Sequence, residues 1–246
     1  MVTSTAAAHK TPQQQTRVLI VGNYCHDVLM QKDTVKAESL GGAASFISNV
    51  VNGMSVSYRV LKRVSACDPI RPSDLPDARS KFGMAVGVGG EILPETLERM
   101  IETCDAVFVD IQALIRVFDS VDGTVKLVKL EETEFYSLLP RIEVLKASSE
   151  EAVFMDVEEV RKWCCVVVTN GKEGCKVYWK DGELGIQPFL ANQKDPTGAG
   201  DSFLGGFVAG LVQGLAVPDA ALLGNLFGSL TVEQIGLPKF DSRLLQ

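Results

Sequence analysis

Residues 195–203 read Asp-Pro-Thr-Gly-Ala-Gly-Asp-Ser-Phe and lead into an apolar stretch. The proline and the two glycines prevent a regular helix or strand before the second glycine, so a helix is predicted over residues 201–213. Main-chain N–H groups are free at the N-terminus of a helix, and small residues leave them open to an anion. We therefore expect Gly198, Ala199 and Gly200 to bind a negatively charged group.

The aspartate that ends this loop, Asp201, indicates chemistry beyond anion binding. A carboxylate beside an anion site would repel the anion if the loop only bound it. The same carboxylate is useful if it accepts the proton of an attacking hydroxyl while the N–H groups stabilise a transferred phosphoryl group. The alternative is that Asp201 only caps the start of the helix, which is a common use of aspartate.

The rest of the chain alternates between strands and helices, which predicts an α/β protein, a three-layer α/β/α sandwich with a mostly parallel sheet. Strands are expected at residues 17–22, 83–88, 106–111, 126–130, 142–146 and 165–169, and helices at 41–51, 94–104, 132–139, 156–163, 201–213 and 219–232. A hairpin is expected over residues 175–187, turning at Asp181-Gly182. We expect a disordered tail over residues 1–16 and a single domain over residues 17–246.

The composition restricts the compartment and the partners. The chain has 246 residues, a net charge of −7 and no run of about 18 apolar residues, which argues against a nucleic-acid partner and a membrane span. Its six cysteines form no C-x-x-C pair, as expected for reduced thiols in the cytoplasm. The tail lacks the apolar core of a secretory signal, and its single lysine and absent arginine disfavour a transit peptide.

Residues 195–203 resemble the second signature of the pfkB carbohydrate kinases, the family of ribokinase, adenosine kinase and fructokinase. In that ribokinase-like family the last aspartate of the motif is the catalytic base and the Gly-Ala-Gly segment is the anion hole. The resemblance therefore implies that Asp201 is the base and that residues 198–200 form the hole. It also implies that Asp195 and Thr197 organise the loop and the water network between phosphate and metal.

Two further segments resemble the nucleotide side of the same family. The stretch Val-Val-Thr-Asn-Gly-Lys-Glu-Gly resembles the strand and loop beside the nucleotide, with matches at Thr169, Gly171 and Gly174. A strand followed by a hairpin turn would contain the same glycines. Residues 220–236 resemble the helix that walls the adenine pocket, where Asn225 is the candidate contact; the alternative is an ordinary polar residue on a helix surface.

The cofactors implied by the resemblance are ATP and Mg²⁺. The stretch Lys-Ala-Ser-Ser-Glu-Glu resembles the family's Asn-x-x-Glu segment, whose glutamate helps to place magnesium through water. Glu151 matches this glutamate, whereas Ser148 stands where asparagine is expected. Ser148 and Glu151 would equally form a capping box. The stretch Val-Asp-Ile-Gln, with Arg116 beyond it, resembles an Asp-x-Asn-x-x-Arg strand end; the alternative is that Asp110 caps the next segment.

The acceptor side is expected near the first strand. In the family, an aspartate after this strand and a Gly-Gly pair line the sugar pocket, which implies roles for Asp27 and Gly42; a carboxylate can accept bonds from two neighbouring hydroxyls. Phe46 stands where the family often has asparagine, which argues against ribose-like acceptors. The amino-acid sequences of these segments most resemble the plant inositol kinase branch of the family, and this implies myo-inositol as the acceptor.

The resemblance covers residues 17–240 but is interrupted. Relatives have a longer segment between the Gly-Gly helix and Arg63, with a second strand pair and part of the β lid, so we expect the lid to be partly missing here. One or two final helices are also expected to be missing after Gln246. The nucleotide half should then be intact and the acceptor affinity poor. A homodimer would cover the sheet edge that the shortening exposes.

Two functions remain open from the sequence. The first is an ATP-dependent kinase with a small polyol substrate, and the second is a non-catalytic pfkB-like protein that serves in binding or assembly. A nicotinamide-dependent oxidoreductase is disfavoured because residues 83–90 do not spell G-x-G-x-x-G, and a P-loop kinase because no G-x-x-x-x-G-K-[ST] is present.

Overall fold

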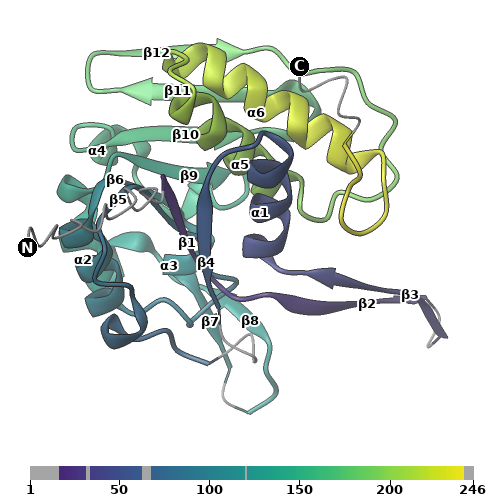
Figure 1. Cartoon of the computed structure of the whole chain (residues 1–246), viewed down its shortest axis with the longest axis horizontal. Helices are drawn as coiled ribbons and strands as arrows, with labels where there is room; N and C mark the ends of the chain where they lie inside the picture. Colours follow the sequence, from purple (N-terminus) through teal and green to yellow (C-terminus); the bar gives the residue numbers. More distant parts are fainter. Residues whose placement is uncertain (1–16, 32–33, 63–67, 120, 241–246) are drawn as a thin grey trace, which may run out of the picture.

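The computed structural model describes residues 17–31, 34–62, 68–119 and 121–240, and these fold around one central sheet (Figure 1). The sheet has eight strands in the order β12-β11-β10-β9-β6-β5-β1-β4. Neighbours from β10 to β4 are parallel, whereas β11 and β12 are antiparallel. The strands are β1 (Val18–Val21), β4 (Tyr58–Leu61), β5 (Ser80–Ala85), β6 (Cys104–Asp110), β9 (Val144–Ser148), β10 (Cys165–Thr169), β11 (Cys175–Trp179) and β12 (Gly182–Ile186).

Helices cover both faces of this sheet, so the three-layer sandwich predicted from the sequence is confirmed. One face is covered by α1 (Ala43–Gly53), α5 (Ala199–Val212) and α6 (Val217–Val232), which lie together in Figure 1. The other is covered by α2 (Pro94–Thr103), α3 (Gln112–Ile115), α4 (Val157–Val160) and the 3₁₀ helix Glu134–Arg141.

The apolar pattern explains this layering. All four residues of β1 are buried, and they alternate between the two cores, as expected for a parallel strand covered on both faces. Helix α5 is buried on nearly all sides because it packs between α1 and α6. Its N-terminus therefore has a fixed position relative to the sheet.

Some elements differ from the sequence prediction. The strand predicted at residues 83–88 is β5, which ends at Ala85 because the glycines that follow it form a loop around Glu91. The helix predicted at 132–139 is a 3₁₀ helix over Glu134–Arg141, where Pro140 has no N–H for a longer helix. The segment predicted as a strand at 126–130 belongs to a hairpin of β7 (Arg116–Phe118) and β8 (Val125–Leu127).

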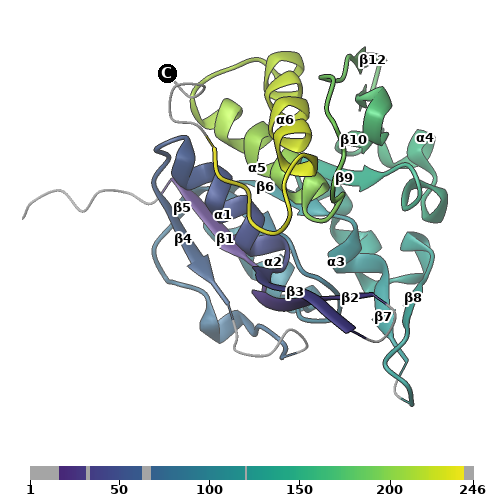
Figure 2. The same cartoon turned by 90° about the vertical axis from the view of Figure 1, so that its right-hand side faces the viewer.

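Two hairpins project from the body of the protein. The hairpin of β2 (Cys25–Gln31) and β3 (Thr34–Gly41) was not predicted, and with β7–β8 it extends from the lower part of the molecule in Figures 1 and 2. The sheet edge beside β1 is occupied by β4, which lies within the segment that is expected to be shortened. In the described residues, no helix combines the length and apolarity of a membrane span. The predicted tail at residues 1–16 lies outside the described residues.

Candidate active site

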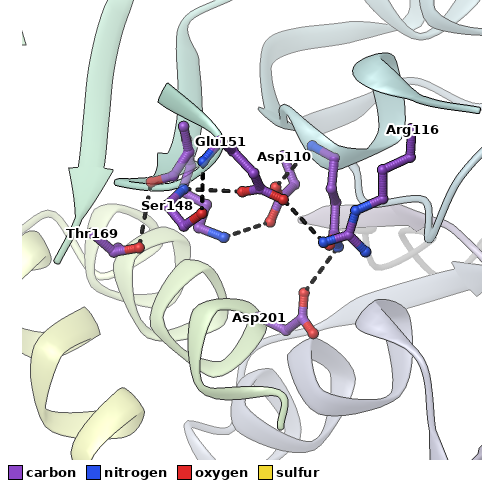
Figure 3. Close-up of polar contacts among 9 residues, drawn as sticks. Asp110, Arg116, Ser148, Glu151, Thr169 and Asp201 are labelled. Atoms are coloured by element: carbon purple, nitrogen blue, oxygen red, sulfur yellow. Dashed lines mark hydrogen bonds and ion pairs between the residues drawn. The ribbon is translucent and has the colours of Figure 1, made fainter. Parts of the chain in front are cut away.

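The candidate site lies where the carboxyl ends of the central strands meet the N-terminus of α5. In open α/β sheets this is the edge at which ligands bind. Figure 3 shows the carboxylates of Asp110, Glu151 and Asp201 facing a shared space, with Arg116 reaching into it. They come from the end of β6, the turn after β9 and the first turn of α5, and so the fold brings together residues far apart in the sequence.

The glycine-rich loop presents free N–H groups, as its sequence predicts. Gly198 precedes α5 in a left-handed conformation (φ 74°), and within the described residues the N–H groups of Gly198, Gly200 and Asp201 donate to no protein group. The N–H of Ala199 is different, since it donates to the carbonyl of Pro196 at 3.2 Å. Three amides thus remain available to an anion, with that of Asp201 in place of that of Ala199.

Asp195 shapes the same loop. Its Oδ1 accepts a hydrogen bond from the N–H of Thr197 (2.9 Å), and its own N–H donates to the carbonyl of Val232 (3.1 Å). The loop is therefore tied to the end of α6. The part of Asp195 and Thr197 in a water network around phosphate and metal stays a prediction.

Gly198 also lies directly on the ring of Phe46. A Cβ atom built on Gly198 would be 2.3 Å from the ring, which is far inside van der Waals contact. Phe46 is only 1% exposed, and its buried ring supports the loop at Gly198 from the protein interior. This packing explains why a residue without a side chain is required at this turn.

Replacing Gly198 with alanine should weaken ATP binding about tenfold or more, because the left-handed conformation costs about 1–2 kcal/mol and the methyl group displaces Phe46. Titration calorimetry with ATP measures this effect. Gly185→Ala is the control, since a Cβ there meets nothing within 4 Å. Equal ATP affinity of the two variants would contradict the packing described above.

Asp201 has the environment of a general base. Burial raises its pKa to about 7, and the carboxylate of Asp110 acts in the same direction against the positive charges of Lys146 and Arg116. Its Oδ1 accepts a hydrogen bond from Nε2 of Gln112 (3.4 Å). A carboxyl group with this pKa can take up a proton near neutral pH.

The sequence did not predict the buried ion pair of Lys146 and Asp110 near Asp201. Lys146 Nζ lies 2.8 Å from Asp110 Oδ2, with side chains that are 6% and 0% exposed. The two residues are register partners on β6 and β9. Burial raises the pKa of Asp110, whereas the charge of Lys146 and its hydrogen bond lower it. Burial lowers the pKa of Lys146, but the carboxylates of Asp110, Asp201 and Glu151 outweigh this effect, so the lysine is charged and the short contact is charge-assisted. A Cβ on Gly200 would lie 2.8 Å from Nζ of Lys146, so the lysine lies next to the glycine-rich loop of residues 198–200.

Glu151 forms the reciprocal bonds of a capping box with Ser148. The N–H of Ser148 donates to Glu151 Oε2 (3.0 Å), and the N–H of Glu151 donates to Ser148 Oγ (3.2 Å). Glu151 Oε1 accepts from Arg116 Nη2 at 3.0 Å. Burial alone would raise the pKa of Glu151, but Lys146, the Ser148 N–H and Arg116 together hold it below its usual value. Glu151 is therefore a fixed carboxylate at neutral pH.

A cavity of about 520 Å³ extends from the glycine-rich loop between the end of β10, the segment that follows β12, and α6. Thr169, Gly171, Gly174 and Asn225 line it, as do Ala199 and Gly200. The Nδ2 group of Asn225 donates to the carbonyls of Ile186 (3.3 Å) and Gln187 (2.8 Å), so this side chain also holds the cavity wall. The size is that of a small-ligand pocket.

The residues predicted to bind the acceptor, Asp27 and Gly42, lie in the hairpin that follows β1 and at the start of α1. Gly42 precedes α1 with φ 85°, and a Cβ there would be 2.7 Å from the carbonyl oxygen of Asn23. Asp27 lies in β2 opposite Ser39, and its side chain is outside what the structure describes. The roles of Asp27 and Gly42 in acceptor binding stay predictions. In the described residues, no cluster of three or more histidine, cysteine or acidic side chains forms a metal site.

The chain matches the model of the pfkB family carbohydrate kinases over residues 98–240. It is 60% identical to inositol 3-kinase of Arabidopsis thaliana over 289 residues, which covers 96% of this chain and 82% of the relative. It is 48% identical to inositol 3-kinase of Oryza sativa subsp. japonica, covering 93% of this chain and 71% of the relative. Since the first alignment has 289 positions and the chain 246 residues, at least 43 positions have no counterpart here.

Solved structures resemble the fold at low sequence identity. A pyrophosphate-dependent kinase in the ribokinase family, complexed with a pyrophosphate analog and myo-inositol, matches with a TM-score of 0.76 and 16% identity over 90% of this chain and 97% of its own. A ribokinase from Thermotoga maritima matches with a TM-score of 0.65 and 14% identity over 90% and 94%. These matches agree with the ribokinase-like sandwich predicted from the sequence.

Proposed function

Because the chain belongs to the pfkB family of carbohydrate kinases, we propose that it is an ATP-dependent kinase that phosphorylates myo-inositol. The observation that carries this proposal is that Asp201 and the three free amides share one turn, whose Ala199 and Gly200 line the 520 Å³ cavity. The acceptor is proposed from the inositol 3-kinases, which are 46–60% identical to this chain. Because these relatives are inositol 3-kinases, we propose the 3-hydroxyl as the attacking group.

In this mechanism each part of the site has one task. The cavity holds the nucleotide, and the free amides of the loop bind the γ-phosphoryl group. Asp201 accepts the proton of the attacking inositol hydroxyl. The new bond forms between that oxygen and the γ-phosphorus, while the bond to the bridging oxygen breaks and ADP leaves with its electron pair.

Mg²⁺ fits the charges of this site. Asp110, Glu151 and Asp201 supply three carboxylates, whereas Lys146 and Arg116 supply two cations. Magnesium is usually held by one or two carboxylates, by water and by substrate phosphates, which suits Glu151 as its protein partner. The metal would neutralise charge on the phosphates.

The test is an assay with ATP or pyrophosphate as donor and myo-inositol, ribose, fructose or adenosine as acceptor. We expect an inositol monophosphate from ATP, detected by ³¹P NMR, and product formation that is at least about 10²-fold slower with Asp201→Asn. Equal product from the parent and this variant would contradict the mechanism. Faster turnover of ribose or fructose would contradict the acceptor, and faster turnover with pyrophosphate would contradict the donor.

The shortened segment favours a second candidate, a pfkB-like protein that binds ATP without transfer. At least 43 positions of the Arabidopsis relative are missing, and a lid that excludes water is a common requirement of kinases. Submillimolar ATP binding without product would support this candidate. ATP binding weaker than millimolar would count against an intact nucleotide half in either case.

We further propose that the protein acts as a homodimer in the cytoplasm. Five described cysteines are free thiols, which suits a reducing compartment, and burial raises the pKa of Cys164, Cys165 and Cys175 to about 12. The edge strand β4 and the exposed apolar side chains of β2–β3 offer a surface for a second copy. Light scattering after size exclusion measures the oligomeric state.

A further inference from the structure

Arg116 is a cation of the site that the mechanism above leaves without a task. It is the first residue of β7, and its side chain is 31% exposed. Lys146, the other cation near Asp201, is almost fully buried and neutralised by Asp110 at 2.8 Å. Of these two, Arg116 is therefore the more open to a ligand that enters the shared space.

The backbone of Arg116 is held in place by the loop after β5. Glu91 is fully buried and accepts hydrogen bonds from the N–H groups of Val88 (2.5 Å) and Gly89 (2.7 Å). A Cβ on Gly89 would be 3.1 Å from Cβ of Arg116 and 3.0 Å from the ring of Phe118. The absence of a side chain at Gly89 thus lets the hairpin pack against this loop.

The guanidinium group of Arg116 is held by Glu151, whose carboxylate is held in turn by Ser148. Its Nη2 donates to Glu151 Oε1 at 3.0 Å, and Glu151 is held by its two bonds with Ser148. Within the described residues Arg116 makes no other hydrogen bond, so its Nε and Nη1 donors are available. A planar guanidinium with free donors is well suited to phosphate oxygens.

The guanidinium faces the space that Glu151 and Asp201 share. Figure 3 shows it beside the carboxylate of Glu151, with Asp201 facing the same space. Its charge lowers the pKa of both carboxyl groups, as expected at short range. We expect a phosphoryl group attacked by an oxygen that Asp201 deprotonates to come within reach of this guanidinium.

We propose that Arg116 is a catalytic residue that donates hydrogen bonds to the transferring γ-phosphoryl group, and that Glu151 is the positioning residue that orients it. This inference rests on the proposed function. As the acceptor oxygen bonds to the γ-phosphorus and its proton goes to Asp201, the bond to the bridging oxygen breaks and ADP leaves. Arg116 neutralises the charge on the oxygens of the moving group, which the carboxylates nearby would otherwise repel.

The test compares Arg116→Met with Arg141→Met, whose arginine forms a surface pair with Glu98 at the same distance of 3.0 Å. Loss of a transition-state donor should lower kcat about 10²–10³-fold, while the KM for ATP changes little. Arg141→Met should match the parent. Guanidinium ions should partly restore the activity of Arg116→Ala, which a merely structural role would not allow. A kcat of Arg116→Met within about threefold of the parent would overturn the proposal.

A second measurement does not need acceptor turnover. ADP with magnesium and fluoroaluminate mimics the phosphoryl group in transfer, and the parent should bind it more tightly than ADP alone. Arg116→Met should lose this gain but keep the affinity for ADP. Retention of the gain by the variant, or its absence in the parent, would overturn the role of Arg116. A parent that shows the gain but makes no inositol phosphate would instead overturn the acceptor of the proposed function.

Glu151→Gln separates positioning from metal binding. If Glu151 orients Arg116, this variant lowers kcat and also loses the fluoroaluminate gain at saturating magnesium. If Glu151 serves only the metal, saturating magnesium restores both, and the positioning part of the proposal is wrong. Arg116→Met should leave the magnesium half-saturation unchanged.

Discussion

Replacing Asp201 with asparagine is expected to lower kcat by about 10²–10⁴-fold, because the variant cannot accept the proton of the acceptor hydroxyl. The same substitution should raise the melting temperature. The raised pKa of Asp201, about 7, means that the folded protein holds a proton that the unfolded chain has lost above its ordinary pKa of 3.8. Stability therefore falls as the pH rises between these values, and asparagine removes this cost.

The pH dependence gives an independent check of the same assignment. The parent should gain activity as the pH rises through about 7, where Asp201 loses its proton. The stability advantage of the asparagine variant should grow as the pH rises from 3.8 to about 7 and stay constant above that. Asp219→Asn is the control, because Asp219 also stands in the first turn of a helix but is exposed. A variant that is inactive and also less stable at pH 8 would point to a structural role instead.

Breaking the ion pair between Asp110 and Lys146 should have the largest effect on stability. Asp110→Asn or Lys146→Met alone leaves a buried charge without its partner, which costs about 3–5 kcal/mol. The double variant removes both charges and should recover most of this loss. Thermal or urea unfolding of the four proteins measures the coupling.

The two single variants should also shift the pH dependence of kcat in opposite directions. Asp110 raises the pKa of Asp201 and Lys146 lowers it, so Lys146→Met should move the acidic limb to higher pH and Asp110→Asn to lower pH. Arg79→Met is a suitable control, because its pair with Asp105 is exposed. Additive losses in the double variant would show that the two charges do not interact.

The sequence predicted the layers and the anion loop because both depend on local patterns. The run Val18–Val21 and the apolar helix after Gly200 need no distant contact to be recognised, and both stand where they were predicted. The strand Cys165–Thr169 was predicted at its observed bounds. Family resemblance then supplied the base and the acceptor class, which spacing alone left open.

The rest of the site depends on contacts between distant residues. The position of Lys146 in the site was not predicted, because a lysine in a strand does not by itself indicate a buried ion pair. Only the fold brings it to Asp110 and Gly200. The β7–β8 hairpin was missed because its strands have three residues each. The position of Arg116 opposite Glu151 was therefore not predictable from the sequence.

The contact between Phe46 and Gly198 connects the proposed acceptor side at Gly42 with the proposed phosphate loop, because Phe46 is only one helical turn from Gly42. Phe46 lies one turn after Gly42 on α1, and its ring packs against Gly198 in the loop that we propose binds the phosphate. A polyol that displaces the start of α1 must also displace the ring under Gly198. The affinities for the two substrates should then be linked, and each should change the binding of the other by the same factor.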